Sequence, residues 1–246
     1  MTPENSTDHP QRPRDYFATT RWTVVLAAGN RSTPDADVAL EELCRTYWYP
    51  LYAYIRRHGH SKEDAEDLAQ SFFARFLQKN YLEKLRSEHG KFRAFLLASL
   101  KHFLANEWDR AHRQKRGGGA TLLSLDWQNA DTRYQIDPAD HLSPDKLYDR
   151  AWAVTLLERV ITRLRAEHSE DAAAFEQLKP FLMVGRNEVP YAQAAAKLSM
   201  TEGTMRVAVH RLRRRYRELL REEIRQTLSD PNQVEEEMRS LFGAFG

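Results

Sequence analysis

Cysteine is almost absent from this sequence, and so are long apolar runs. The single cysteine, Cys44, excludes a disulfide within the chain, which fits a reducing compartment. No stretch approaches the roughly 20 consecutive apolar residues that a membrane-spanning helix needs. The segment from Thr2 to Asp15 is polar and Pro-rich, with no apolar run of signal-peptide length. We therefore expect a soluble protein of the cytoplasm.

Net charge is the second feature that is nearly missing. The 37 Lys and Arg residues are almost balanced by 35 Asp and Glu residues, so the formal net charge is +2. Overall charge therefore does not indicate a nucleic-acid partner, and the distribution of charge along the chain is the better guide. The 246 residues exceed one minimal domain and are enough for two small cores.

Helical periodicity dominates what the sequence does contain. Apolar residues recur at spacings of three and four, and no strand pattern of any length is present, so we predict an all-α fold. Pro50 lies inside the first long helix and predicts a kink or break there. Ser61 predicts the N-cap of the next helix, with Asp64 in a variant capping box. The predicted helices span residues 21–28, 36–57, 62–78, 91–116, 146–168, 170–184, 190–197 and 201–225.

The domain organisation follows from a long segment without periodicity. Residues 117–145 carry no sustained helical pattern and are too many for an internal loop of a compact domain. We therefore predict two helical domains, residues 36–116 and 146–226, joined by this segment as a flexible linker. Residues 1–35 are predicted to be a disordered tail and a short helix. Residues 227–246 are predicted to be a C-terminal tail. Its residues 231–246 are acidic and then apolar, and we consider the hypothesis that they fold back on a domain.

The segment from Pro190 to Leu220 has the pattern of a helix-turn-helix. A short Ala-rich helix is followed by a turn and by a longer helix with a basic outer face. Between Met205 and Arg221 there are seven arginines and one acid, Glu218. Arginine can bind guanine O6 and N7 in a bidentate way, and arginines further along such a helix suit phosphates. We predict that this helix enters the major groove of DNA, in preference to the alternative of a solvated surface helix.

The predicted helix at 91–116 carries a basic stripe with one aromatic ring. Lys101, Trp108, His112 and Lys115 share one face, which suits a DNA strand because cations can bind phosphates and a ring can stack on bases. The alternative is that Trp108 is a core residue around which the lysines extend to solvent. Both interpretations stay open on this helix alone.

The predicted helix at 62–78 has an acidic face instead. Glu63, Asp64, Glu66, Asp67 and Gln70 lie beside two aromatic residues, Phe73 and Phe76. An acidic surface next to a basic one argues against simple wrapping by nucleic acid and indicates a protein partner. The alternative is an ordinary amphipathic core helix, and for the two aromatic residues that alternative is the better one.

Taken together, these segments resemble a known family. The stretch from Asp64 to Leu77 resembles the second conserved region of bacterial RNA polymerase sigma-70 factors of the extracytoplasmic-function (ECF) type. Phe92 to Leu96 and the basic helix after it resemble the next segment, and Tyr191 to Leu219 is similar to the fourth region, a helix-turn-helix of winged-helix-like type. The resemblance implies a sigma factor that binds core RNA polymerase and directs it to specific promoters. It implies no enzyme activity, cofactor or metal.

The resemblance also implies a role for each part. The clamp of the largest polymerase subunit would be bound by Asp64, Asp67, Gln70 and Phe73. The loop at 80–90 and the basic helix would open the −10 element and bind its single strand through Arg93, Lys101, Asn106, Trp108, Arg110, His112, Arg113 and Lys115. The −35 element would be bound as duplex by Thr201, Thr204, Arg206, Val207, His210, Arg211 and Arg214. The second-largest polymerase subunit and an anti-sigma factor are further partners that the family allows.

Two positions depart from the family pattern. Val207 stands where a small polar residue is common, so an apolar contact to a thymine methyl would replace a hydrogen bond. Asn106 stands where an Asp is common, which leaves the −10 contacts open.

Two other functions are alternatives to that of a sigma factor. A stand-alone helix-turn-helix transcriptional regulator predicts a dimer and a pseudo-palindromic DNA site, but it leaves the acidic helix unexplained. An enzyme would need a site such as a metal cluster of His58, His60, Glu63 and Asp64, whose spacing lacks the His-Glu-x-x-His form. We expect no metal site and no catalytic residue.

Overall fold

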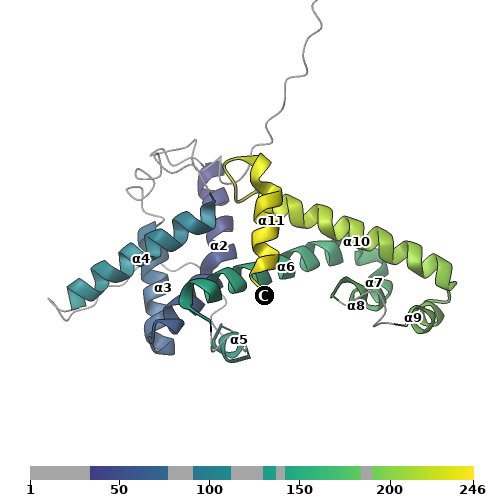
Figure 1. The fold of residues 1–246 in the computed structure, drawn as a ribbon, viewed down its shortest axis with the longest axis horizontal. Helices are drawn as coiled ribbons and strands as arrows, with labels where there is room; N and C mark the ends of the chain where they lie inside the picture. Colours follow the sequence, from purple (N-terminus) through teal and green to yellow (C-terminus); the bar gives the residue numbers. More distant parts are fainter. Residues whose placement is uncertain (1–33, 77–90, 112–129, 137–141, 184–189) are drawn as a thin grey trace, which may run out of the picture.

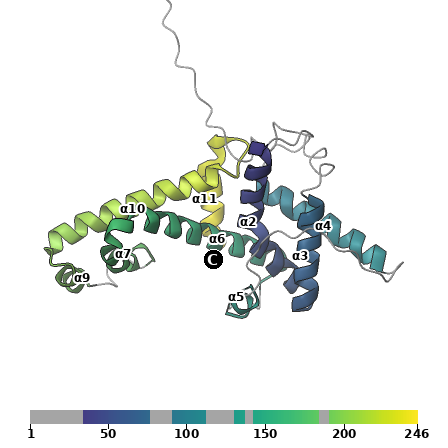
Figure 2. The same cartoon turned by 180° about the vertical axis from the view of Figure 1, so that it is seen from behind.

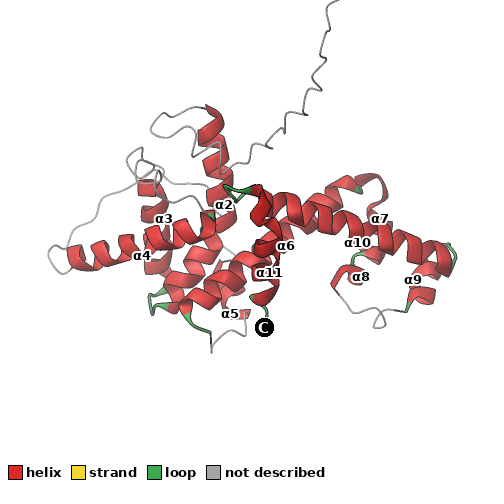
Figure 3. Ribbon diagram, turned by 45° about the horizontal axis from the view of Figure 1, so that its top comes forward, coloured by secondary structure: helices red, strands yellow, loops and turns green. Residues whose placement is uncertain are grey.

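The computed structural model describes residues 34–76, 91–111, 130–136, 142–183 and 190–246. Within these ranges every regular element is a helix, apart from one isolated antiparallel bridge between Lys91 and Leu228. The prediction of an all-α fold is confirmed (Figure 3). None of the helices in the described ranges combines the length and the apolar character that crossing a membrane requires. The predicted helix at 21–28 lies outside them.

Three helices, α2 (Pro34–Arg57), α3 (Lys62–Phe76) and α4 (Phe92–Ala111), form the first half of the structure. Ser61 caps α3, because its Oγ accepts a hydrogen bond from the backbone N–H of Asp64 at 3.1 Å. This agrees with the predicted cap. The helix α2 runs through Pro50 without a break. Buried residues on both sides of Pro50, among them Tyr47 and Tyr54, fix the helix by packing where the proline removes a backbone hydrogen bond.

The core of this half is built from aromatic rings. Phe72, Phe76, Phe92 and Phe103 are each at most 1% exposed. The ring centroids of Phe72 and Phe103 lie 5.6 Å apart, and those of Phe76 and Phe92 lie 6.3 Å apart. Both pairs meet edge to face, an arrangement that stabilises aromatic contacts beyond the area they bury. The aromatic cluster therefore fixes α3 against α4.

A long helix, α6 (Pro144–Glu167), connects this half to the second one. It packs on α2 and on α10 (Glu202–Arg225), so it belongs to both halves (Figure 1). Trp152 lies fully buried on α6, and its Nε1 donates a hydrogen bond to the Tyr47 hydroxyl of α2 at 3.0 Å. The Tyr148 hydroxyl donates to the backbone carbonyl of Arg93 on α4 at 3.0 Å. The two halves are therefore packed together through α6.

The predicted flexible linker differs from the structure at residues 130–136. These residues form a short helix, α5 (Ala130–Ile136), which packs on α2. Ala130 is 1% exposed, and the guanidinium carbon of Arg56 lies 5.0 Å from the centre of the Tyr134 ring. A seven-residue helix is too short to show helical periodicity in sequence, which explains why the segment was predicted as linker.

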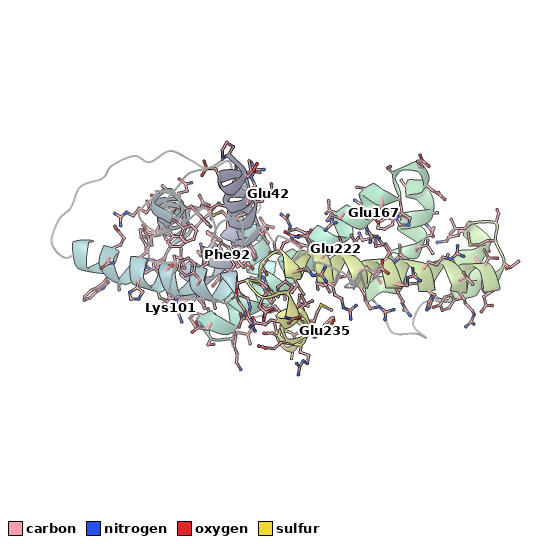
Figure 4. All side chains as sticks on the ribbon, turned by 90° about the horizontal axis from the view of Figure 1, so that it is seen from above. Glu42, Phe92, Lys101, Glu167, Glu222 and Glu235 are labelled. Atoms are coloured by element: carbon pink, nitrogen blue, oxygen red, sulfur yellow. The ribbon has the colours of Figure 1, made fainter. Side chains whose placement is uncertain are left out.

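The second half continues with four further helices: α7 (Ala172–Leu178), α8 (Pro180–Met183), α9 (Tyr191–Lys197) and α10, preceded by a 3-10 turn, η2 (Ser169–Asp171). One helix at 170–184 was predicted where α7 and α8 occur. The break coincides with Pro180, which cannot donate a backbone hydrogen bond and suits the first position of a new helix. The charged contacts between α6 and α10 lie near Glu167 and Glu222 (Figure 4).

The C-terminal segment folds back on the rest of the chain. A 3-10 turn, η3 (Pro231–Gln233), reverses the chain after α10 and leads into α11 (Val234–Gly243). The helix α11 packs against α10 and α6 (Figure 2). Val234, Met238 and Leu241 are its buried apolar residues. The hypothesis that this tail folds back on a domain is confirmed.

Candidate nucleic-acid interface

The helices α9 and α10 pack as a pair joined by a tight turn. Ala194 and Ala195 are buried against α10, where Met205 and Val209 are buried in turn. The small alanine side chains allow this close approach of the two helices. The turn is closed by a hydrogen bond from the Met200 N–H to the Ala195 carbonyl at 3.0 Å.

Two local devices shape the turn and begin α10. Ser199 adopts a left-handed backbone conformation with φ of 52°, which reverses the chain direction and is uncommon for a residue other than glycine. Thr201 is the N-cap, and its Oγ1 accepts from the N–H of Thr204 at 3.1 Å. This cap begins α10, and the geometry presents the first turns of the helix outward.

The outer face of α10 brings together the residues predicted to bind duplex DNA. All seven are exposed on the first half of the helix: Thr201, Thr204, Arg206, Val207, His210, Arg211 and Arg214. Val207 is 51% exposed, so its apolar side chain lies on this outer face. Two other arginines of α10 contact the protein instead. Arg213 donates to the Phe181 carbonyl, and Arg215 donates to Glu167 at 2.6 Å.

Only some of the residues predicted to bind single-stranded DNA are exposed on the described part of α4. Trp108 is 65% exposed, so the alternative that it belongs to the core is wrong. Asn106 is exposed as well, and so is Lys101 (Figure 4). The Lys101 Nζ donates to Asp145 at 2.5 Å, which raises the pKa of the lysine. The side chain of Arg110 and the residues His112, Arg113 and Lys115 lie outside what the structure describes.

Arg93 does not lie on this surface, which corrects the prediction for that residue. Its side chain is 13% exposed and forms ion pairs with Asp149 of α6 and Glu237 of α11. Its guanidinium carbon lies 4.7 Å from the centre of the buried Trp152 ring. DNA cannot reach the guanidinium in this arrangement. The sequence shows a basic residue at position 93, but it does not show that a carboxylate 144 residues away returns to bind it.

The polar residues predicted on the acidic face of α3 are exposed or half-buried. Asp64 and Asp67 are exposed and Gln70 is half-buried. Phe73 is 1% exposed, with its ring centroid 5.5 Å from that of Phe72. The prediction that Phe73 belongs to a partner-binding surface is therefore wrong in this structure, because its ring is buried in the aromatic core together with that of Phe76.

The described residues do not form the metal cluster that an enzyme would need. The Nδ1 of His58 lies 3.1 Å from the Tyr54 carbonyl, within hydrogen-bond distance. No group of three or more His, Cys, Asp or Glu residues in the described ranges is placed to bind a metal ion. Burial raises the pKa of the Cys44 thiol, which disfavours the nucleophilic thiolate.

Two sets of contacts could not be predicted from the sequence. One is the carboxylates of α11: Glu236 and Glu237 both bind Lys91, at 2.7 and 2.8 Å. Three consecutive acids at the start of α11 were the only signal for them. The other is the contact of Tyr191 with Arg206, with 4.9 Å between the guanidinium carbon and the ring centre. A tyrosine at a helix start gives no sequence signal for such a role.

Comparison with known families gives a match within the part of the chain that forms α2, α3 and α4. Residues 43–114 match the family described as sigma-70 region 2. They include most of α2 and all of α3 and α4, and thus Asp64, Asp67 and Trp108. Comparisons with curated proteins and with solved structures found no match. The matched segment is therefore similar to region 2 of the sigma-70 factors.

Proposed function

We propose that this chain is a sigma factor of the extracytoplasmic-function type. It binds core RNA polymerase and directs it to specific promoters, and it carries out no chemistry itself. The single observation that carries the proposal is the sigma-70 region 2 match over residues 43–114. The exposed basic face of α10 in the same chain supplies a second DNA-binding element. Because core polymerase is cytoplasmic, the protein would act in the cytoplasm.

In this proposal the two halves have different ligands. Residues 36–116 form the region 2-like part, and residues 146–226 form the region 4-like part. The segment 117–145 connects them. Residues 1–35 precede the region 2-like part, and residues 227–246 are an additional element after the region 4-like part. The region 4-like part would bind the −35 element through the exposed face of α10. An exposed arginine and an apolar Val207 on that face suit base edges and a thymine methyl respectively.

The region 2-like part would serve both polymerase and the −10 element. Asp64, Asp67 and Gln70 on α3 would contact the clamp of the largest subunit. Trp108, Lys101 and Asn106 on α4 would bind the single strand, with the ring on a base and the amine on a phosphate. Arg110, His112, Arg113 and Lys115 continue this stripe in sequence. Contacts to the second-largest subunit and to an anti-sigma factor are further proposals that rest on the resemblance alone.

Charge reversal on α3 tests the polymerase contact. We expect Asp64→Lys and Asp67→Lys to weaken co-purification of the full chain with core RNA polymerase. Asp35→Lys is the matched control, since Asp35 is also an exposed acid in the first turn of a helix. The control therefore loses the same favourable interaction with a helix N-terminus. Equal retention of polymerase by all three variants would contradict the assignment of α3.

The alternative function is a stand-alone helix-turn-helix transcriptional regulator. The α9–α10 pair is the observation that favours it, since such a pair binds DNA in many repressors. It predicts a dimer that binds a pseudo-palindromic duplex tightly without polymerase. Sedimentation of the purified protein on such a duplex distinguishes the two proposals.

A further inference from the structure

Arg206 is oriented by two contacts before any DNA is bound. Its side chain is 63% exposed on the second turn of α10. Its Nε and Nη2 both donate to the same oxygen of Glu202, Oε1, at 3.2 and 2.6 Å. Its guanidinium carbon lies 4.9 Å from the centre of the Tyr191 ring of α9. One edge and one face of the guanidinium are therefore already in contact with the protein.

The Tyr191 ring is itself fixed by the helices beneath it. Its centroid lies 4.7 Å from that of Phe181 of α8, and Phe181 is 2% exposed. The Phe181 carbonyl accepts a hydrogen bond from Arg213 Nε of α10 at 2.9 Å. The orientation of Arg206 thus depends on a chain of contacts through α8, α9 and α10.

The other exposed arginines of α10 lack this arrangement. In the described part of the chain, Arg214 contacts only the carboxylate of Glu218, and Arg211 and Arg217 form neither ion pairs nor ring contacts. Within the described ranges, none of these three side chains is held by both a carboxylate and a ring, which suits phosphates that can be met from many directions. A base edge demands one direction, and fixing a long side chain only at the moment of binding costs entropy.

We propose that Glu202 and Tyr191 are positioning residues that make Arg206 specific for guanine. A guanidinium has five N–H donors in one plane. Glu202 takes the edge formed by Nε and Nη2, and Tyr191 covers one face. The end formed by Nη1 and the second Nη2 hydrogen remains, with two parallel donors that match guanine O6 and N7. This inference rests on the proposed function of α10 as the reader of duplex DNA.

A selection experiment identifies the base that Arg206 contacts. The full chain, alone and with core RNA polymerase, is used to select from a duplex library randomised over a promoter-length window. The base preferences of the wild type are compared with those of Arg206→Ala. We expect one position to lose a guanine preference of about tenfold to hundredfold, the discrimination of one bidentate arginine contact. If the lost preference is for another base, or if none is lost, the proposal is overturned.

The positioning role is tested by variants that leave Arg206 in place. Tyr191→Leu removes the ring, and we expect it to reduce the guanine preference at that position about twofold to fivefold, as an exposed cation–π contact would. Tyr191→Phe keeps the ring and should keep the preference. Glu202→Gln removes the carboxylate charge at an exposed residue, so it does not threaten folding, and it should lower the same preference.

Coupling to Arg206 separates positioning from a general structural effect. In the Arg206→Ala background, Tyr191→Leu should leave the base preference at that position unchanged. In the Arg211→Ala background, Tyr191→Leu should still reduce that preference, so that the effects of the two substitutions add. A Tyr191→Leu effect that is equal in both backgrounds, or absent, overturns the positioning role while the sigma function stands. If no form binds duplex DNA, both the proposed function and this inference fail.

Discussion

Glu237 of α11 and Arg93 of α4 form a buried ion pair across 144 residues of sequence. Glu237 is fully buried, and the Arg93 side chain is 13% exposed. Lys91 reaches the second oxygen of Glu237 at 2.8 Å, and Arg93 Nη2 also donates to Ser240 at 2.8 Å. The C-terminal helix is thereby joined to α4, the helix that carries the candidate single-strand surface. The contacts give the tail a structural role.

Removing one charge of this pair should destabilise the fold strongly. Glu237→Gln leaves Arg93 and Lys91 with less compensation in a buried place, and breaking a buried pair costs about 3 to 5 kcal/mol. We expect the free energy of unfolding, measured with urea, to fall by roughly 3 kcal/mol.

Asp149→Asn is the control for this variant. Asp149 is 43% exposed, and its pKa is raised because its burial outweighs the charge of Arg93. Replacing it should cost less than about 1 kcal/mol, in the range of exposed ion pairs. Equal losses for the two variants would show that Glu237 is not the dominant partner of Arg93.

Two neighbouring residues test how much the fold depends on α11. Leu241 is fully buried and Phe242 is 57% exposed, although both lie in the last turns of the same helix. Leu241→Ala should lower the free energy of unfolding by about 2 to 5 kcal/mol, because it opens a cavity. Phe242→Ala should change it by less than about 0.5 kcal/mol, as surface substitutions do. Two similar small losses would contradict the packing of the tail.

Stability should fall in acid because several carboxylates are paired with arginine or lysine. A hydrogen bond from Arg215 lowers the pKa of Glu167, one from Arg221 lowers that of Glu235, and one from Lys91 lowers that of Glu236. A carboxylate with a lowered folded pKa stabilises the fold above its unfolded pKa, about 4.3. That contribution is lost as the pH falls through the folded pKa.

The acid dependence is measured by urea unfolding at pH 7 and at pH 3.5. Glu167→Gln should reduce the difference in the free energy of unfolding between pH 7 and pH 3.5, because the variant has no carboxylate at this position to take up a proton. Glu170→Gln is the control, because Glu170 is exposed and has no ion pair among the described residues. A wild type whose stability does not change in acid would refute the role of these pairs.

The exposed ring of Trp108 should matter for DNA and not for stability. Trp108→Ala should leave the unfolding midpoint unchanged and weaken binding of a single-stranded −10 oligonucleotide by polymerase holoenzyme. The expected loss is about 1 to 3 kcal/mol, the contribution of one stacked base. Val38→Ala removes a comparably exposed apolar side chain and should change neither quantity. An unaltered affinity for the Trp108 variant would exclude stacking.

Local features of this fold could be predicted from sequence, because they depend on neighbouring residues. The caps at Ser61 and Thr201 are set by residues three positions apart. The exposed basic face of α10 follows from helical periodicity, since its buried residues recur every three or four positions.

Features that depend on distant partners could not be predicted in this way. Arg93 is a basic residue on the same helix as the predicted DNA contacts. It is buried because α11 folds back and places Glu237 against it. The sequence is compatible with either an exposed or a buried side chain at Phe73, and the packing of the folded chain buries it to 1% exposure. The orientation of Arg206 depends in part on Tyr191, which belongs to another helix.

Transcription reconstituted from purified components tests the central claim most directly. The full chain and core RNA polymerase are incubated with promoter DNA from the genome that encodes this protein, and run-off transcripts are measured with and without the chain. The account predicts defined transcripts that require the chain and that decrease for Asp64→Lys and for Arg206→Ala. A chain that neither binds core polymerase nor changes where it initiates would contradict the assignment as a sigma factor.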